Sequence, residues 1–248
     1  MRTTKNNEPT AFIHSVETAG MVDGPGIRYT IFFQGCPLRC VYCHNPDTWK
    51  PEGGRKMTVQ ELLSDVKKYR SYLRFSGGGV TITGGEPLLQ AEFLALLLRA
   101  LKAQGIHTAL DTSGYTGSQT ARRVLEYTDL MLLDIKTIDP AAYKALTGVP
   151  IDPTLRTLEI SKEMGVPVWL RFVLIPGWTD NPAHIRQMRK YLDGFDNIQK
   201  IEVMPFHKMG EYKWADLGMK YSLADTPSPS REDLENVRTI LRDWRNIT

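Results

Sequence analysis

The sequence predicts an α/β fold, a partial barrel of six parallel strands that alternate with helices. Three observations predict it: short apolar segments recur along the 248 residues, helical patterns separate them, and polar side chains follow nearly every segment. Alternation of this kind indicates a parallel sheet. Six units fit either an open doubly wound sheet or an incomplete barrel. The carboxyl ends of strands converge on one mouth only in a barrel, so the polar residues that follow the strands favour the barrel.

The predicted strands are short and mostly rich in β-branched residues. Few of them alternate cleanly between apolar and polar positions, which is typical of parallel strands that are covered on both faces. They span residues 28–33, 80–83, 107–111, 130–135, 168–173 and 201–204.

The predicted helices carry apolar residues at helical spacing. In the first of them, Thr58 and Glu61 have the spacing of a capping box. Gly105 and Gly165 follow two others, in the position where glycine commonly ends a helix. The predicted helices span residues 58–72, 90–104, 118–126, 153–164, 182–192 and 230–245.

Length and composition predict one well-packed domain over residues 1–248, with 42% hydrophobic and 24% charged residues. No apolar run is long enough to span a membrane, and the polar N-terminus lacks the core of a signal peptide, so we expect a cytoplasmic protein. A net charge of +3 without a dense basic block argues against nucleic-acid binding. Lys67, Lys68, Arg70 and Arg74 are either a solvated helix face or a docking patch for an acidic electron donor.

The three cysteines, Cys36, Cys40 and Cys43, lie within eight residues at C-x3-C-x2-C spacing. An odd count argues against a disulfide framework, and closely placed thiols suggest a metal site or a cluster. A four-iron cubane normally takes four thiolates, so three would leave one iron open for chemistry. Two alternatives remain. A haem attached through the C-x-x-C-H motif that ends at His44 would leave Cys36 idle and require export, and a structural zinc would need a fourth ligand such as His207.

Two further motifs follow predicted strands. Gly84 and Gly85 would let the backbone approach a ligand closely, and Glu86 could offer a carboxylate to an ammonium group or favour the start of a helix. Asp134 and Lys136 are two residues apart in a strand and therefore share one face. They are either a solvated strand end, paired with each other, or part of a binding pocket.

The cysteine spacing, together with Gly84-Gly85-Glu86, resembles the radical SAM superfamily. The resemblance implies a TIM-like radical SAM core over about residues 13–245, after an N-terminal extension of residues 1–12. It also implies a [4Fe-4S] cluster on the three cysteines, whose open iron binds S-adenosylmethionine. Reductive cleavage of that cosubstrate gives a 5′-deoxyadenosyl radical that abstracts a hydrogen atom. The cofactor-binding residues so implied are Tyr42, His44, Gly84, Gly85, Glu86, Asp111, Thr112, Asp134, Ile135, Lys136 and His207, with a monovalent cation near Asp111 and Asp134.

Longer motifs narrow the resemblance to activators of glycyl radical enzymes, from about Ile13 onward. They are Val22-Asp23-Gly24-Pro25-Gly26-Ile27-Arg28, Phe32-Phe33-Gln34-Gly35-Cys36 and Cys43-His44-Asn45-Pro46-Asp47-Thr48-Trp49. Pro205-Phe206-His207 and Lys213-Trp214 are similar to the activators of pyruvate formate-lyase (formate C-acetyltransferase) in particular. The absence of cysteine from residues 44–83 excludes the ferredoxin-like insert of many other activators.

This narrower resemblance implies a protein substrate. A glycine loop of pyruvate formate-lyase would enter a wide barrel mouth and lose a hydrogen atom from its Cα, in anaerobic glucose metabolism. The electron donor would be a flavodoxin or a ferredoxin, and we expect a monomer. The alternatives are an activator of a different glycyl radical enzyme and, in another class, a non-catalytic zinc or haem protein. The resemblance gives His14 and His184 no role.

Overall fold

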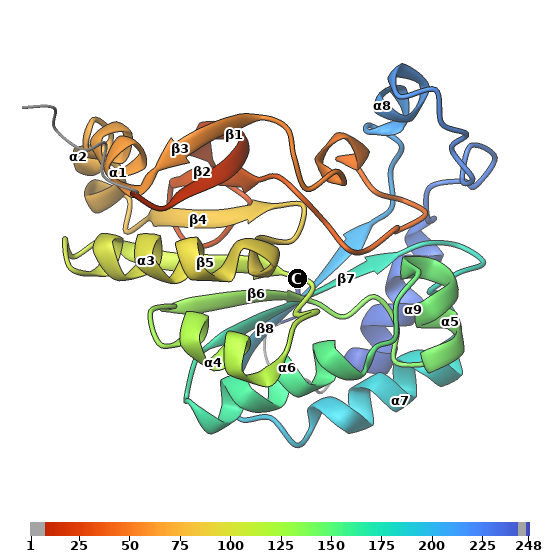
Figure 1. The fold of residues 1–248 in the computed structure, drawn as a ribbon. Helices are drawn as coiled ribbons and strands as arrows, with labels where there is room; N and C mark the ends of the chain where they lie inside the picture. Colours follow the sequence, from red (N-terminus) through yellow and green to blue (C-terminus); the bar gives the residue numbers. More distant parts are fainter. Residues whose placement is uncertain (1–7, 243–246) are drawn as a thin grey trace, which may run out of the picture.

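The computed structural model describes residues 8–242 and 247–248 (Figure 1). The strands in these residues belong to one eight-stranded sheet. The strand order is β3-β1-β2-β4-β5-β6-β7-β8, and every pairing from β2 to β8 is parallel. These six strands follow one another in chain order, whereas a doubly wound sheet reverses its strand order at a switch point. The order confirms the prediction of a partial barrel. The strands are β1 Thr10–Gly20, β2 Arg28–Phe33, β3 Arg55–Thr58, β4 Gly79–Gly84, β5 His107–Thr112, β6 Leu130–Asp134, β7 Val168–Leu174 and β8 Ile198–Pro205.

All six predicted strands are present, with ends that differ by at most three residues. The sequence did not reveal β1 and β3, which extend the sheet by antiparallel pairing beyond β2. Most residues of β1 are exposed or half-buried, and β3 is only Arg55–Thr58, so neither has the apolar run of a central strand. Residues 10–12, which the sequence suggested to be part of an extension, belong to β1.

Helices cover the outer face of the barrel, and several were predicted closely (Figure 1). Those of the parallel units are α3 Ala91–Lys102, α4 Ser118–Leu125, α6 Asp152–Glu163, α7 Pro182–Leu192 and α9 Arg231–Leu241. The last was expected to reach residue 245, and its predicted end lies outside the described residues. Two short helices, α5 Pro140–Thr147 and α8 Glu211–Asp216, were not predicted. Short 3-10 turns, η1 Pro46–Thr48 and η2 Pro87–Gln90, complete the set.

The helix predicted over residues 58–72 is two helices, α1 Val59–Lys67 and α2 Arg70–Phe75. Its start was predicted correctly, because the Glu61 amide donates to the Thr58 hydroxyl and the Thr58 amide donates to the Glu61 carboxylate. The break follows from tightened hydrogen bonds at the end of α1. The amide of Lys68 bonds the carbonyl of Asp65, three residues back, and the amide of Tyr69 does the same to Val66.

Side chains alternate between the two faces of each barrel strand. In β2, Tyr29, Ile31 and Phe33 belong to the main hydrophobic core. The alternate residues of the strand include Arg28 and Thr30, which are also fully buried and bond polar groups instead. The barrel therefore has an apolar outer layer beneath the helices. Its interior holds a small apolar cluster of Ala109, Leu130 and Leu132, and polar groups line it toward the carboxyl ends of the strands. Among the described residues, no helix has the length and apolar character to cross a membrane.

Candidate active site

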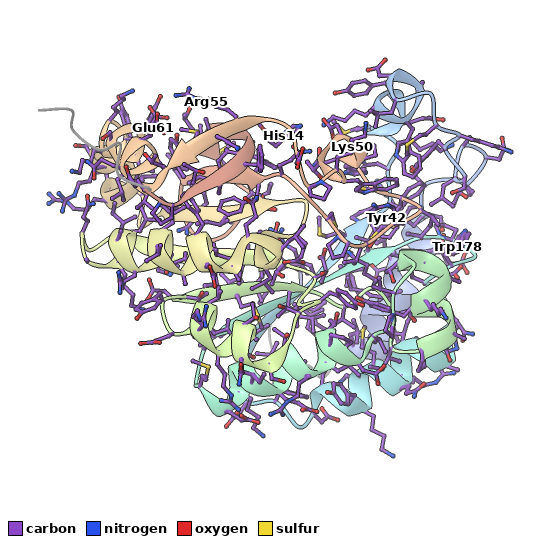
Figure 2. All side chains as sticks on the ribbon, viewed as in Figure 1. His14, Tyr42, Lys50, Arg55, Glu61 and Trp178 are labelled. Atoms are coloured by element: carbon purple, nitrogen blue, oxygen red, sulfur yellow. The ribbon has the colours of Figure 1, made fainter. Side chains whose placement is uncertain are left out.

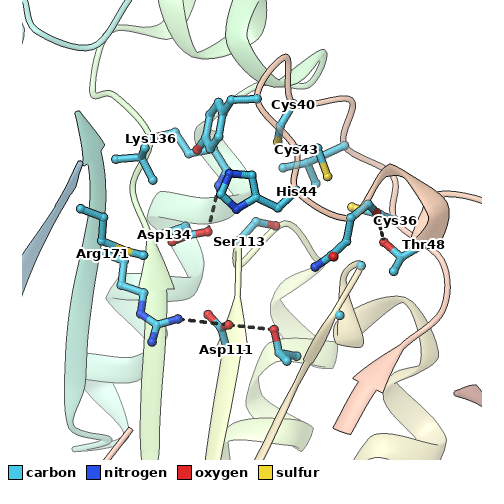
Figure 3. Close-up of a pocket in the computed structure, with 18 of the residues that line it drawn as sticks. Cys36, Cys40, Cys43, His44, Thr48, Asp111, Ser113, Asp134, Lys136 and Arg171 are labelled. Atoms are coloured by element: carbon cyan, nitrogen blue, oxygen red, sulfur yellow. Dashed lines mark hydrogen bonds and ion pairs between the residues drawn. The ribbon is translucent and has the colours of Figure 1, made fainter. Parts of the chain in front are cut away.

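A cavity of about 260 Å³ lies at the carboxyl ends of the barrel strands. The cysteine loop forms one wall, and the ends of β4 to β8 form the others (Figure 3). Of the site residues predicted from the sequence, all except Glu86 and Ile135 line this cavity. Ile135 is fully buried in the main hydrophobic core.

The cysteine loop, residues 34–50, is held at both ends by backbone hydrogen bonds. The Gly35 amide donates to the carbonyl of Thr48 at 2.7 Å, which brings the two ends of the loop together. In the middle, the amides of Arg39 and Val41 donate to carbonyls at the end of α5. The loop is thus closed at its ends and attached to the end of α5 between Cys36 and Cys43.

The three thiols line the cavity, and none of them forms a disulfide. Burial raises the pKa of all three and takes that of Cys40 to about 12, although Lys136 opposes the shift. Thiolates in such surroundings need compensating positive charge, which bound iron supplies. The donor set therefore fits a thiolate-ligated cluster. In the part of the chain that the structure describes, no three Cys, His, Asp or Glu side chains are already gathered as ligands of one ion, and His207 joins no such group with the cysteines.

Gly84 and Gly85 allow the chain to pass against the cysteine loop without side chains. Gly84 has a φ of +124°, and a Cβ there would lie 2.2 Å from the amide nitrogen of Phe33. A Cβ on Gly85 would lie 2.2 Å from the carbonyl oxygen of Gly35 and 3.1 Å from Cβ of Cys36. Only glycine fits these contacts, so the turn after β4 supports the loop directly.

The Glu86 carboxylate lies behind this turn and is 1% exposed. Its Oε1 accepts from the Thr112 hydroxyl at 2.6 Å and the Leu88 amide at 3.1 Å. Its Oε2 accepts from the amide and the hydroxyl of Ser113. Burial raises the pKa of Glu86, and these hydrogen bonds counteract the shift. In this structure the carboxylate is therefore fully engaged by the ends of β5 and η2 and ties them to the glycine turn.

Asp111 lies in the barrel interior, where it accepts a hydrogen bond from Thr83 at 2.7 Å. Its Oδ2 is also 3.2 Å from Nη1 of Arg171 (Figure 3). Burial raises the pKa of Asp111, and the charge of Arg171 works against that rise. Arg171 also bonds Glu202 and donates to the backbone carbonyl of Val22, so it links β5, β7, β8 and the β1–β2 loop.

Asp134 and Lys136 form an ion pair, with Oδ2 and Nζ 2.8 Å apart. The Lys136 side chain is only 8% exposed, so the pair is not a solvated strand end. Burial lowers the pKa of Lys136, but the Asp134 carboxylate and the neighbouring ionisable groups together outweigh it, and the net pKa is raised. The ammonium also lies 5.3 Å from the centre of the Tyr42 ring, beneath the cysteine loop.

Two histidines meet at the rim of the cavity. The ring centroids of His44 and His207 are 4.4 Å apart, and Nε2 of His44 is 3.0 Å from the His207 carbonyl oxygen. Burial lowers the pKa of His44, which keeps its ring neutral near pH 7. This contact joins the cysteine loop to the segment that follows β8.

The sequence did not point to Thr83, Ser113 or Arg171, although all three line the cavity. Arg171 gave a usable signal, because a charged residue interrupts an otherwise apolar predicted strand at residues 168–173. Such a residue must find a partner inside the barrel. Thr83 and Ser113 gave no comparable signal, since hydroxyl residues at strand ends are common.

Comparison with known proteins gives concordant matches. A family model described as Radical SAM superfamily matches residues 30–188. The pyruvate formate-lyase 1-activating enzyme of Escherichia coli (strain K12) is 42% identical over 234 residues, covering 94% of this chain and 95% of that protein. The pyruvate formate-lyase-activating enzyme of Clostridium pasteurianum is 44% identical, covering 93% of this chain and 97% of that protein.

Solved structures give the same fold. A domain of a pyruvate-formate lyase-activating enzyme from Bacteroides vulgatus ATCC 8482 aligns with a TM-score of 0.58 and 28% identity, over 69% of this chain and 99% of that one. Streptococcus suis SuiB bound to S-adenosylmethionine aligns with a TM-score of 0.65 and 20% identity, over 87% of this chain and 48% of that one. The second likeness bears on the fold alone.

Proposed function

We propose, from the premise that this chain belongs to the radical SAM superfamily and within it to the pyruvate formate-lyase-activating enzymes, that it places a radical on a glycine of pyruvate formate-lyase. The family implies a [4Fe-4S] cluster and S-adenosylmethionine. Together, when bound, these supply the organic radical that abstracts a hydrogen atom. The observation that carries the proposal is the cavity, where three unpaired thiols face the polar ends of the barrel strands.

In this proposal Cys36, Cys40 and Cys43 hold the cluster and leave one iron without a protein thiolate. The chain has no fourth cysteine. The glycine turn at Gly84 and Gly85 packs its backbone against β2 and the start of the cysteine loop, and it lines the cavity that would receive the cosubstrate. The similarity to pyruvate formate-lyase-activating enzymes, over more than nine-tenths of the chain, favours this cluster over the zinc or haem alternative.

The polar side chains of the cavity would orient the cosubstrate and keep water away from it. Asp134 and Lys136 present both charges at one wall, which suits the amino and carboxylate groups of an amino acid. A monovalent cation near Asp111 and Asp134 would have to share Asp111 with Arg171, which already contributes a positive charge there. The cation is tested by measuring S-adenosylmethionine affinity in potassium, sodium and choline chloride. Equal affinity in all three would exclude it.

We propose a flavodoxin or a ferredoxin as the electron donor, docked near the cysteine loop. The basic patch, Lys67, Lys68, Arg70 and Arg74, is on α1, α2 and the turn between them, at the amino end of β4, whereas the cavity is at its carboxyl end. Figure 2 shows Glu61 of α1 and Tyr42 of the cysteine loop at opposite ends of the sheet. A six-residue strand separates the ends by about 20 Å, which disfavours this patch for electron delivery.

An anaerobic assay tests the function. Protein reconstituted with iron and sulfide is mixed with a reductant, S-adenosylmethionine and pyruvate formate-lyase, and the glycyl radical is measured by electron paramagnetic resonance (EPR). We expect a radical signal on pyruvate formate-lyase and formation of 5′-deoxyadenosine. A signal on a different glycyl radical enzyme, with none on pyruvate formate-lyase, would identify that enzyme as the substrate instead. The monomeric state and cytoplasmic location remain predictions.

A further inference from the structure

The short helix α8 is attached to the cysteine loop by two consecutive side chains. Nζ of Lys213 lies 2.9 Å from Oδ1 of Asn45 and 3.1 Å from Oδ2 of Asp47. The indole Nε1 of Trp214 donates to the carbonyl of Cys43 at 2.9 Å. These contacts reach the last cysteine and the two polar residues that follow it closely in the chain.

The start of α8 also packs closely against the backbone of the cysteine loop, and β1 contacts the same loop. A Cβ on Gly210 would lie 2.6 Å from Cα of His44, so the start of α8 touches the loop backbone. On the far side of the loop, Nε2 of His14 in β1 lies 2.9 Å from Oδ2 of Asp47. Asp47 is therefore held between β1 and α8, by a histidine and by Lys213.

A six-residue helix has little stability of its own, so α8 keeps its position through these contacts. The Lys213 and Asp47 side chains are 21% and 29% exposed, which leaves them largely shielded from water. The connection between β8 and α9 thus places a cation against the stretch of chain that directly follows Cys43.

We propose that Lys213 is a positioning residue: it holds Asn45 and Asp47, and through them the orientation of the Cys43 thiol toward the cluster. The inference rests on the proposed function only in requiring that the chain bind a cluster. It needs no particular protein substrate. Residues that orient metal ligands commonly change metal affinity by about 10- to 100-fold when they are removed.

The test compares four reconstituted single variants and one double variant without any partner protein. Lys213→Met removes the cation and keeps the length, Lys213→Arg restores it, and Asp47→Asn weakens the acceptor. Lys220→Met removes an exposed charge from the same connection as the matched control. The two readouts are the rate of iron release to a ferrous chelator and the EPR spectrum of the reduced cluster.

We expect Lys213→Met to release iron about tenfold faster and to change the EPR spectrum, with Lys213→Arg near the parent and Lys220→Met unchanged. The effects of Asp47→Asn and Lys213→Met should be less than additive in the double variant, because the two side chains share one ion pair. Parent-like iron release and spectrum in folded Lys213→Met would overturn the proposal, as would a parent chain that binds no iron. If Lys213→Met fails to fold, the same readouts on Asp47→Asn decide. Failure to activate pyruvate formate-lyase with an intact cluster would instead reject the proposed function alone.

Discussion

Arg171 and Asp111 form an ion pair across the interior of the barrel, with Nη1 3.2 Å from Oδ2. Their side chains are 8% and 16% exposed, so both charges are largely removed from water. Each therefore depends on the other, and Arg171 additionally fixes Glu202. Both residues line the cavity, so the same ion pair shapes its wall and stabilises the sheet.

Arg171→Met should destabilise the iron-free protein by about 3 kcal/mol, because it leaves the Asp111 carboxylate buried without its cation. Urea unfolding measures the effect. The control is Arg189→Met, which breaks the more exposed pair of Arg189 with Asp193 on α7 and should cost less than about 1 kcal/mol. Equal losses in the two variants would show that the interior pair is no stronger than a surface pair.

Lys136→Met should both destabilise the protein and weaken S-adenosylmethionine binding, because Asp134 then lacks its partner in the cavity. The expected loss in the free energy of unfolding is about 2 kcal/mol, since Asp134 keeps some contact with water. The double variant of Asp134→Asn and Lys136→Met removes both charges and should recover most of the stability but not the binding. If the double variant did not recover stability either, Lys136 would act mainly by packing against Tyr42.

Glu86→Gln should lower the free energy of unfolding by about 1–3 kcal/mol, because an amide NH₂ would face donors that now bond a carboxylate oxygen. The groups affected are the hydroxyl of Thr112 and the amide and hydroxyl of Ser113. Glu92→Gln, at an exposed site on α3, is the matched control and should change little. Calorimetric titration of the loaded protein should also give weaker S-adenosylmethionine binding for Glu86→Gln, because Glu86 holds the glycine turn that lines the cavity. Binding by Glu86→Gln as tight as in the parent protein would show that this carboxylate has no role in holding the cosubstrate.

The pH dependence of the free energy of unfolding should reveal how much the ionised Asp129 carboxylate stabilises the fold. Its Oδ2 accepts from the amide and hydroxyl of Thr108, and its Oδ1 lies 2.5 Å from Nζ of Lys102. Burial raises the pKa of Asp129, but these partners outweigh it and the net pKa is lowered.

A lowered folded-state pKa gives stability that is present above the unfolded pKa of about 4 and is lost as pH falls through the folded value. Asp129→Asn should therefore cost about 1 kcal/mol at pH 7, since the site is partly solvated, and almost nothing near pH 2. Urea unfolding between pH 7 and pH 2 measures the gap. A constant gap would mean that the carboxylate's charge is irrelevant.

The sequence predicted those parts of the fold that depend on local pattern. The six barrel strands are apolar and mostly β-branched, so they could be recognised without knowledge of their neighbours. The strand state of Arg55–Thr58 is imposed by pairing with β1, and its exposed residues have no strand pattern of their own. The short helices α5 and α8 were missed for a similar reason, because contacts with the cysteine loop support them.

The same distinction applies to the site. The three cysteines were found from their spacing, and most other site residues followed from the resemblance to the radical SAM superfamily. All of them except Glu86 and Ile135 line one cavity. Arg171 and Lys213 were not found as site residues, because their partners lie far away in the sequence: Lys213 bonds Asp47 across 166 positions. Contacts between such distant residues follow from the closed tertiary structure, which no local pattern encodes.

Cys40→Ala should abolish cluster binding while leaving the fold intact. Cys40 forms no disulfide, and alanine is close to it in size, so the iron-free variant should lose no more than about 1–2 kcal/mol of stability. With two thiolates remaining, a four-iron cluster would have two irons without a protein ligand. We therefore expect clearly fewer irons per chain than in the parent protein. We also expect no reductive cleavage of S-adenosylmethionine, which is measured by chromatography of 5′-deoxyadenosine. Arg39→Ala, a change in the same loop that leaves every thiol in place, is the control and should still bind iron. Full cleavage by Cys40→Ala would show that Cys40 is not a ligand and that the cluster takes its third protein ligand from elsewhere in the cavity.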